Sequence, residues 1–134
     1  MKIYFCGSIR GGRQDAELYA RLIDRLKAYG TVLTEHVGSS ALTEFGGDGG
    51  NEYIWKRDTD WLRDCDVVVA ECTTTSIGVG YELAFAEALR KRVVVLYRGD
   101  PGRLSAMVAG DPNFEIYYYQ GEEEFDSLLK EIFK

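Results

Sequence analysis

The sequence lacks the features that mark several specialised classes of protein. Its three cysteines, Cys6, Cys65 and Cys72, form no CxxC pair, so neither a disulfide framework nor a zinc knuckle is indicated. No apolar run approaches the roughly 20 residues that cross a membrane. The apolar stretch at the start is too short for a signal peptide. We therefore expect a cytoplasmic protein with free thiols, no metal and no membrane partner.

An excess of basic residues is also missing. The 16 Lys and Arg against 22 Asp and Glu give a net charge of −6. This balance argues against a nucleic acid polymer as the partner, because affinity for the phosphate backbone needs dense basic residues. A few local arginines in an acidic chain suit a small phosphorylated ligand better.

Short β-rich runs alternate with segments of helical period along the chain, and the length fits one domain over residues 1–134. The expected strands are Lys2–Cys6, Thr31–Thr34, Asp66–Ala70, Val93–Tyr97 and Glu115–Tyr119. The expected helices are Asp15–Tyr29, Tyr53–Leu62, Glu82–Arg90 and Glu122–Phe133. A polar loop with five glycines fills residues 38–50.

This alternation predicts an α/β fold, a three-layer Rossmann or flavodoxin-like domain with a parallel five-stranded sheet in the order 2-1-3-4-5. Ligands of such sheets bind beyond the carboxyl ends of the strands. Four segments that follow strands are therefore expected to meet on one rim, namely Gly7–Arg13, His36, Ser76–Glu82 and Gly99–Ser105.

The loop after the first strand is rich in glycine and basic residues. It reads Gly7-Ser8-Ile9-Arg10-Gly11-Gly12-Arg13. Glycines let backbone amides approach an oxyanion, and arginine adds a bidentate partner. We favour contact with a phosphate or sugar over the alternative, a plain turn with solvated arginines.

Glu82 follows Ser76-Ile77-Gly78-Val79-Gly80-Tyr81, which indicates a glycine-rich turn before a helix. Such a turn cradles phosphates, and a carboxylate there repels them, so Glu82 is a candidate for another part of the same ligand. The alternative is an acid in the first helical turn, favoured by the helix dipole. That position is expected to lower its pKa and keep it ionised. The spacing alone leaves both interpretations open.

Three other residues are candidates for the same rim. Asp58 can pair with Glu82 only if it faces the rim, where two carboxylates would flank a glycosidic carbon; otherwise it is a solvated helix acid, as expected for Asp60. Tyr4 can hydrogen-bond a carboxylate or simply belong to the core. His36, the single histidine, has no companion at metal spacing, and is either a ligand contact or a structural residue.

Five blocks of the sequence resemble a known family, the 2′-deoxynucleoside 5′-phosphate N-hydrolases of the nucleoside 2-deoxyribosyltransferase superfamily. The similarity extends over almost the whole chain. The blocks are Tyr4–Arg13, Leu33–Val37, Asp66–Glu71, Gly78–Leu83 and Leu104–Met107.

The resemblance implies cleavage of a deoxynucleoside monophosphate into a free base and 2-deoxyribose 5-phosphate, with no cofactor. By the family motif Glu82 is the nucleophile, Asp58 assists the departing base or the sugar hydroxyl, and Tyr4 orients Glu82. The loop from Gly7 to Arg13 lines the nucleotide pocket together with Ser76 and Gly78. Ser105 and Met107 reach the phosphate pocket of a neighbouring subunit, which implies a homodimer.

The base is left open, because the 38–52 loop departs from the family pattern and relatives differ in substrate. They act on purine monophosphates, on 5-hydroxymethyl-dUMP or on ribonucleotides such as CMP. A deoxyribosyltransferase and a non-catalytic nucleotide- or flavin-binding module remain alternatives. A phosphoribohydrolase of the cytokinin-activating type is disfavoured, because its Pro-Gly-Gly-x-Gly-Thr signature is absent.

Overall fold

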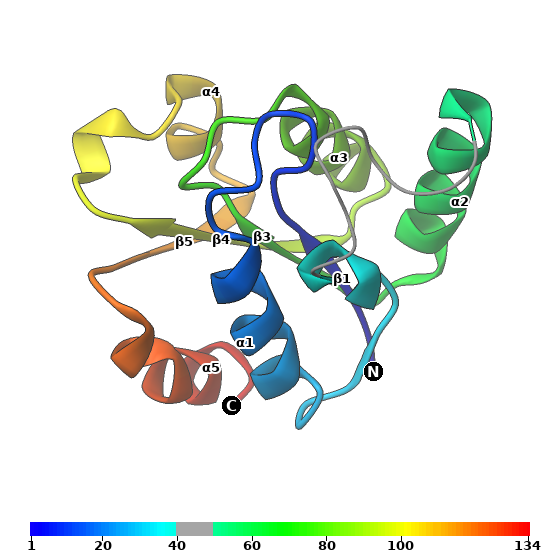
Figure 1. The fold of residues 1–134 in the computed structure, drawn as a ribbon. Coiled ribbons are helices and arrows are strands. Elements are labelled where there is room, and N and C mark those ends of the chain that lie inside the picture. Colours follow the sequence, from blue (N-terminus) through cyan, green and yellow to red (C-terminus); the bar gives the residue numbers. More distant parts are fainter. Residues whose placement is uncertain (40–49) are drawn as a thin grey trace.

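A computed structural model describes residues 1–39 and 50–134, and a parallel sheet forms its centre (Figure 1). The sheet has five strands in the order β2-β1-β3-β4-β5, and every neighbouring pair is parallel. The strands are β1 (Lys2–Cys6), β2 (Thr31–Val32), β3 (Val67–Glu71), β4 (Arg92–Arg98) and β5 (Phe114–Tyr119). The predicted fold class and strand order are confirmed. Most of the expected 38–50 loop lies outside the described residues, and a single domain over 1–134 stays a prediction.

Helices cover both faces of the sheet. The helices are α1 (Ala16–Leu26), α2 (Asn51–Asp64), α3 (Ile77–Ala88), α4 (Ala106–Ala109) and α5 (Phe125–Ile132). Short 3-10 turns are η1 (Glu35–Gly38), η2 (Pro101–Arg103) and η3 (Glu122–Glu124). Helices α1 and α5 lie on one face and α2 and α3 on the other (Figure 1). No helix in the described ranges is long and apolar enough to cross a membrane.

The strands supply a core on each face by alternation. On β1, Ile3 and Phe5 pack toward α1 and α5, whereas Tyr4 and Cys6 pack toward α2 and α3. This alternation places the Tyr4 side chain on the face that carries α3.

The second strand is shorter than expected, since Leu33 and Thr34 are not part of it. At Thr34 the side-chain hydroxyl takes the place of the backbone hydrogen bonds between the strands. It accepts a hydrogen bond from the Phe5 N–H and donates one to the Phe5 carbonyl, both at 2.7 Å. The backbone is thus released to turn into η1, which carries His36.

The prediction of a glycine-rich turn before Glu82 is wrong, because α3 already begins at Ile77. Ser76 is its N-cap, and its Oγ accepts a hydrogen bond from the Val79 N–H at 3.3 Å. This cap and a buried face of Val79, Leu83 and Ala86 outweigh the cost of two helical glycines, about 1 kcal/mol each. Glu82 therefore lies in the second turn of the helix.

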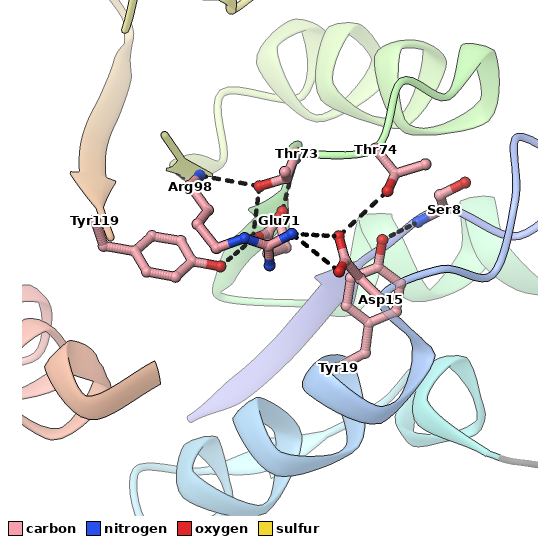
Figure 2. A network of polar contacts seen from close by, with 8 residues as sticks. All are labelled: Ser8, Asp15, Tyr19, Glu71, Thr73, Thr74, Arg98 and Tyr119. Carbon is pink, nitrogen blue, oxygen red and sulfur yellow. Dashed lines mark hydrogen bonds and ion pairs between the residues drawn. The ribbon is translucent and has the colours of Figure 1, made fainter. Parts of the chain in front are cut away.

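A buried carboxylate, Glu71, ties together the carboxyl ends of three strands (Figure 2). Its Oε1 accepts the Thr73 N–H at 2.6 Å, and its Oε2 accepts the Thr73 hydroxyl at 2.9 Å and the Tyr119 hydroxyl. Burial raises the pKa of Glu71, and these donors oppose the shift. Tyr119, on the edge strand β5, therefore also helps to hold this buried carboxylate.

The same network continues to α1 and to the loop that enters α3. The Arg98 N–H donates to the Thr73 hydroxyl at 2.9 Å, and the Arg98 guanidinium binds both oxygens of Asp15 at 3.0 and 3.2 Å (Figure 2). The Thr74 hydroxyl donates to Asp15 at 3.2 Å. Residues 73–74 are therefore held from two sides just before Ser76.

Substitution of Glu71 by Gln tests the network. One carboxylate oxygen becomes an NH2 group that faces donors, so we expect the free energy of unfolding to fall by about 1–3 kcal/mol. Urea unfolding at neutral pH measures this, with the exposed Glu123→Gln as the matched control. Equal stability of Glu71→Gln and wild type would contradict the assignment of Glu71 as a charged acceptor.

Candidate active site

A pocket of about 690 Å³ opens at the carboxyl end of β1, between the first loop, η1, α2 and the start of α3. We call it the Glu82 pocket. It brings together nine of the residues expected on the rim, namely Gly7, Ile9, Arg10, Gly11, His36, Asp58, Ser76, Gly78 and Glu82. The convergence follows from the parallel sheet, because the segments after β1, β2 and β3 leave it at the same edge.

Glu82 meets Tyr4 at the floor of this pocket. The Tyr4 hydroxyl, buried on β1, donates a hydrogen bond to Glu82 Oε2. Burial raises the pKa of Glu82 to about 7, the Tyr4 hydrogen bond opposes this, and the charge of Asp58 adds to it. The expectation of a lowered pKa is wrong, because Glu82 lies a turn inside the helix, where desolvation outweighs the helix dipole.

Tyr4 acts as a fixed donor to this carboxylate. Burial and the charge of Glu82 raise the pKa of Tyr4 far above its ordinary value, so the phenol keeps its proton. The sequence left two roles open for Tyr4, a core residue or a hydrogen-bond donor, and its side chain has both.

Asp58 lies on the pocket wall opposite α3, whereas Asp60 does not. Asp58 is about one-fifth exposed, and its Oδ1 accepts a hydrogen bond from Arg57 Nε at 2.9 Å. Asp60 forms exposed ion pairs with Lys56 and Arg63 at 2.8 and 3.2 Å, and is the solvated helix acid that was predicted.

His36 lines the pocket from η1. Arg57 Nη2 lies 3.1 Å from its Nε2, and the Trp61 ring packs against it with centroids 5.8 Å apart. Burial lowers the pKa of His36, and the positive charge of Arg57 lowers it further. The imidazole is therefore neutral at pH 7.

The first loop divides into pocket residues and scaffold residues. A Cβ at Gly7 would lie 2.8 Å from the Tyr19 ring, and one at Gly11 would lie 2.5 Å from the Thr75 carbonyl, so both positions need glycine. Gly12 has a φ of +128°, which also favours glycine.

Ser8, Gly12 and Arg13 do not line the pocket. The Ser8 N–H donates to the Tyr19 hydroxyl at 3.1 Å. Arg13 donates to the carbonyls of Ser8 and Val37 at 3.1 and 2.7 Å, which ties the loop to η1. In this chain Arg13 thus holds the loop in place through backbone carbonyls.

Ser105 and Met107 lie away from Glu82, around a second hollow of about 410 Å³ that we call the Ser105 pocket. Both side chains are exposed. The two pockets share the segment Thr75, Ser76 and Ile77 as a common wall.

Several pocket residues of α2 were not foreseen, among them Asn51, Trp55 and Arg57. Arg10 Nη2 donates to Asn51 Oδ1 at 2.8 Å, and Trp55 Nε1 donates to the Tyr81 hydroxyl at 3.1 Å at the half-exposed mouth. A signal existed for Asn51 and Trp55, since they share a helical face with Asp58 at spacings of four and three residues.

Metal ligands do not gather in this chain as far as it is described. Across residues 1–39 and 50–134, no group of three His, Cys, Asp or Glu side chains could hold a metal ion.

Comparison with known proteins assigns the class. Residues 3–117 match the model of the nucleoside 2-deoxyribosyltransferase family, and the chain belongs to that family.

Relatives within the family carry more specific names. The 5-hydroxymethyl-dUMP N-hydrolase of Tetraodon nigroviridis is 49% identical over 138 residues, which cover 99% of this chain and 97% of the relative. The putative 2′-deoxynucleoside 5′-phosphate N-hydrolase 1 of Nematostella vectensis is 51% identical over 137 residues, with 98% and 93% covered. The solved CMP N-glycosidase of Clostridium botulinum shares the fold, with a TM-score of 0.71 at 17% identity, covering 97% of this chain and 98% of that one.

The raised pKa of Glu82 makes stability depend on pH. Its folded-state pKa, about 7, lies above the usual 4.5, so its contribution to stability is complete below pH 4.5 and is lost as pH rises through 7. Relative to Glu82→Gln, the free energy of unfolding of the wild type should fall by up to about 3 kcal/mol between these pH values. Urea unfolding across this range measures it, with the exposed Glu17→Gln as control. Parallel curves for wild type and Glu82→Gln would show that the carboxyl is not desolvated.

Proposed function

We propose that the protein hydrolyses the N-glycosidic bond of 2′-deoxynucleoside 5′-monophosphates and releases a free base and 2-deoxyribose 5-phosphate. N-glycosidic cleavage is the activity named for relatives about half identical over nearly the whole chain. The observation that carries the proposal is the pairing of Glu82 with Tyr4 in the pocket that also holds Asp58.

Glu82 is the nucleophile of the proposed reaction. In its ionised form a carboxylate oxygen bonds to the anomeric carbon as the carbon–nitrogen bond breaks and its electron pair leaves with the base. Water then attacks the same carbon and releases Glu82. A 2-deoxy sugar lacks the electron-withdrawing 2′-hydroxyl, so positive charge develops on it more readily, and one carboxylate with modest help to the leaving group suffices.

Tyr4 and Asp58 support this step. The Tyr4 hydroxyl holds one oxygen of Glu82 and thereby fixes the direction of the other. Asp58, on the facing helix, assists the departing base or the sugar hydroxyl. Because the pKa of Glu82 is about 7, close to half of the nucleophile is ionised at neutral pH.

The phosphate of the substrate is expected at the N-terminus of α3. Ser76 caps this helix, and Gly78 in its first turn leaves the amides open, since a Cβ there would meet only the Ser76 hydroxyl at 3.7 Å. Helix N-termini favour anions through unpaired N–H groups and the helix dipole. Gly7 and Gly11 bring the first loop against the same region.

The pocket is completed by a second copy of the chain in this proposal. Met107 is 85% exposed and Ile77 is 93% exposed, which leaves apolar surface beside the shared wall of the two pockets. In a homodimer, Ser105 and Met107 of one copy would reach the phosphate of the other.

Release of base from a panel of nucleotides tests the reaction. We expect activity on at least one deoxynucleoside monophosphate or on 5-hydroxymethyl-dUMP, and much less on the matching unphosphorylated nucleoside. Glu82→Ala should abolish activity by a factor of at least about 10³ while nucleotide binding persists. Liquid chromatography of the free base measures the first result, and calorimetry measures the second.

Controls in the same assay separate the alternatives. Equal rates on nucleosides and monophosphates would show that the enzyme does not recognise the phosphate. CMP, and a second base offered as acceptor, test ribonucleotide hydrolysis and deoxyribosyl transfer. Full activity of Glu82→Ala would refute the assignment of Glu82 as the nucleophile.

Mixing two inactive variants tests the shared site. Ser105→Asp puts a negative charge where the neighbouring phosphate should lie, and Glu82→Gln removes the nucleophile. In a random mixture of dimers about one quarter of the sites regain both native residues, so about a quarter of wild-type activity should return. No recovery, despite subunit exchange seen by mass spectrometry, would place Ser105 in its own subunit's site. Native activity of Ser105→Asp on its own would place Ser105 outside any site.

A further inference from the structure

A cation is built into the wall of the Glu82 pocket, between Asp58 and His36. Arg57 of α2 is 22% exposed; its Nε donates to Asp58 Oδ1 at 2.9 Å, and its Nη2 lies 3.1 Å from His36 Nε2. One planar guanidinium therefore bridges two candidate site residues from different elements, a geometry that Lys cannot reproduce.

Two aromatic rings fix the plane of this guanidinium. Its central carbon lies 5.1 Å from the centre of the Trp61 ring and 5.7 Å from that of Tyr53. Both distances are within the range of cation–π attraction. Trp61 also packs against His36, so the arginine, the ring and the imidazole form one packed group.

The bridge determines the tautomer of His36. A guanidinium has only donors, so His36 Nε2 must accept the hydrogen bond and the neutral ring carries its proton on Nδ1. A protonated ring would turn an N–H toward the arginine. Among the described residues, the charged groups that act on the ring are Arg57, Arg13 and Asp58, and Asp58 alone favours the protonated form.

The bridge also orients Asp58. Its hydrogen bond from Arg57 goes to Oδ1, and no other described residue bonds this carboxylate. Oδ2 is thereby left for a ligand in the pocket. Rotation of Asp58 would cost the hydrogen bond to a cation whose other sides are already engaged.

We infer that Arg57 is a positioning residue that holds Asp58 and the Nδ1–H tautomer of His36 as one unit toward the substrate. The inference rests on the proposed function for its kinetic consequence and on the geometry alone for its structural one. It predicts that the loss of Arg57 changes both the tautomer of His36 and the turnover of the enzyme.

The ring nitrogens of His36 give the direct test, because the chain has one histidine and its signals need no assignment. Long-range ¹H–¹⁵N NMR of the full chain should find the proton on Nδ1 in the wild type. In Arg57→Met, which has no donor and no charge, we expect the proton to move to Nε2 in a large share of molecules and the pKa of His36 to rise. Lys56→Met, one residue away on the solvated face, is the matched control and should leave both unchanged.

Kinetics supply the second test, with the nucleotide that the wild type cleaves best. Arg57→Met should lower kcat about tenfold or more and leave KM within about twofold, because positioning acts mainly in the transition state. Arg57→Lys should regain part of kcat, and Lys56→Met should match the wild type.

Two results would overturn the inference. One is a native His36 tautomer in Arg57→Met; even with a loss of kcat, Arg57 would then act by another route. The other is a native kcat in that variant. If the wild type releases no base at all, the proposed function fails, while the NMR comparison still decides whether Arg57 sets the state of His36.

Discussion

The hydrogen bond from Tyr4 to Glu82 joins β1 to α3, and the pKa of the carboxyl in the pocket depends on it. Burial raises the pKa of Glu82 and so favours the protonated form. The phenol offsets part of that cost and holds the pKa near 7, where the carboxyl is both partly ionised and weakly solvated. A carboxylate in this state is a better nucleophile than a solvated one, because little water must be removed before it reacts.

Glu71 is a second buried carboxylate, and it accepts more hydrogen bonds than Glu82 does. Its two oxygens accept three hydrogen bonds from Thr73 and Tyr119, so it stabilises the sheet edge. Glu82 accepts one hydroxyl hydrogen bond, from Tyr4, with the Cys6 thiol beside it, whereas Glu71 accepts three hydrogen bonds. The two buried carboxyls therefore differ in how many donors hold them.

The sequence predicted the strand order and about half of the residues that line the pocket, because these depend on local patterns. β-branched runs such as Val67–Val69 mark strands, and the segments that follow parallel strands must meet at one edge. The start of α3 was mispredicted, since glycine propensity is local whereas the Ser76 cap and the packing of Leu83 depend on the tertiary structure. The pKa of Glu82 was mispredicted for the same reason: desolvation is set by segments distant in sequence. Arg57 escaped notice because a cation beside an acid on a helix is ordinary until His36, 21 residues earlier, is seen beside it.

The wall of residues 75–77 that both pockets share has a consequence for how the protein responds to its own concentration. If a second copy occupies the Ser105 pocket, its side chains contact the segment that caps α3, where we propose that the phosphate binds. Assembly and ligand binding then act on one structural element, and the effect of either on the affinity of the other is returned by the same factor. The apparent affinity for nucleotide would then depend on the concentration of the enzyme.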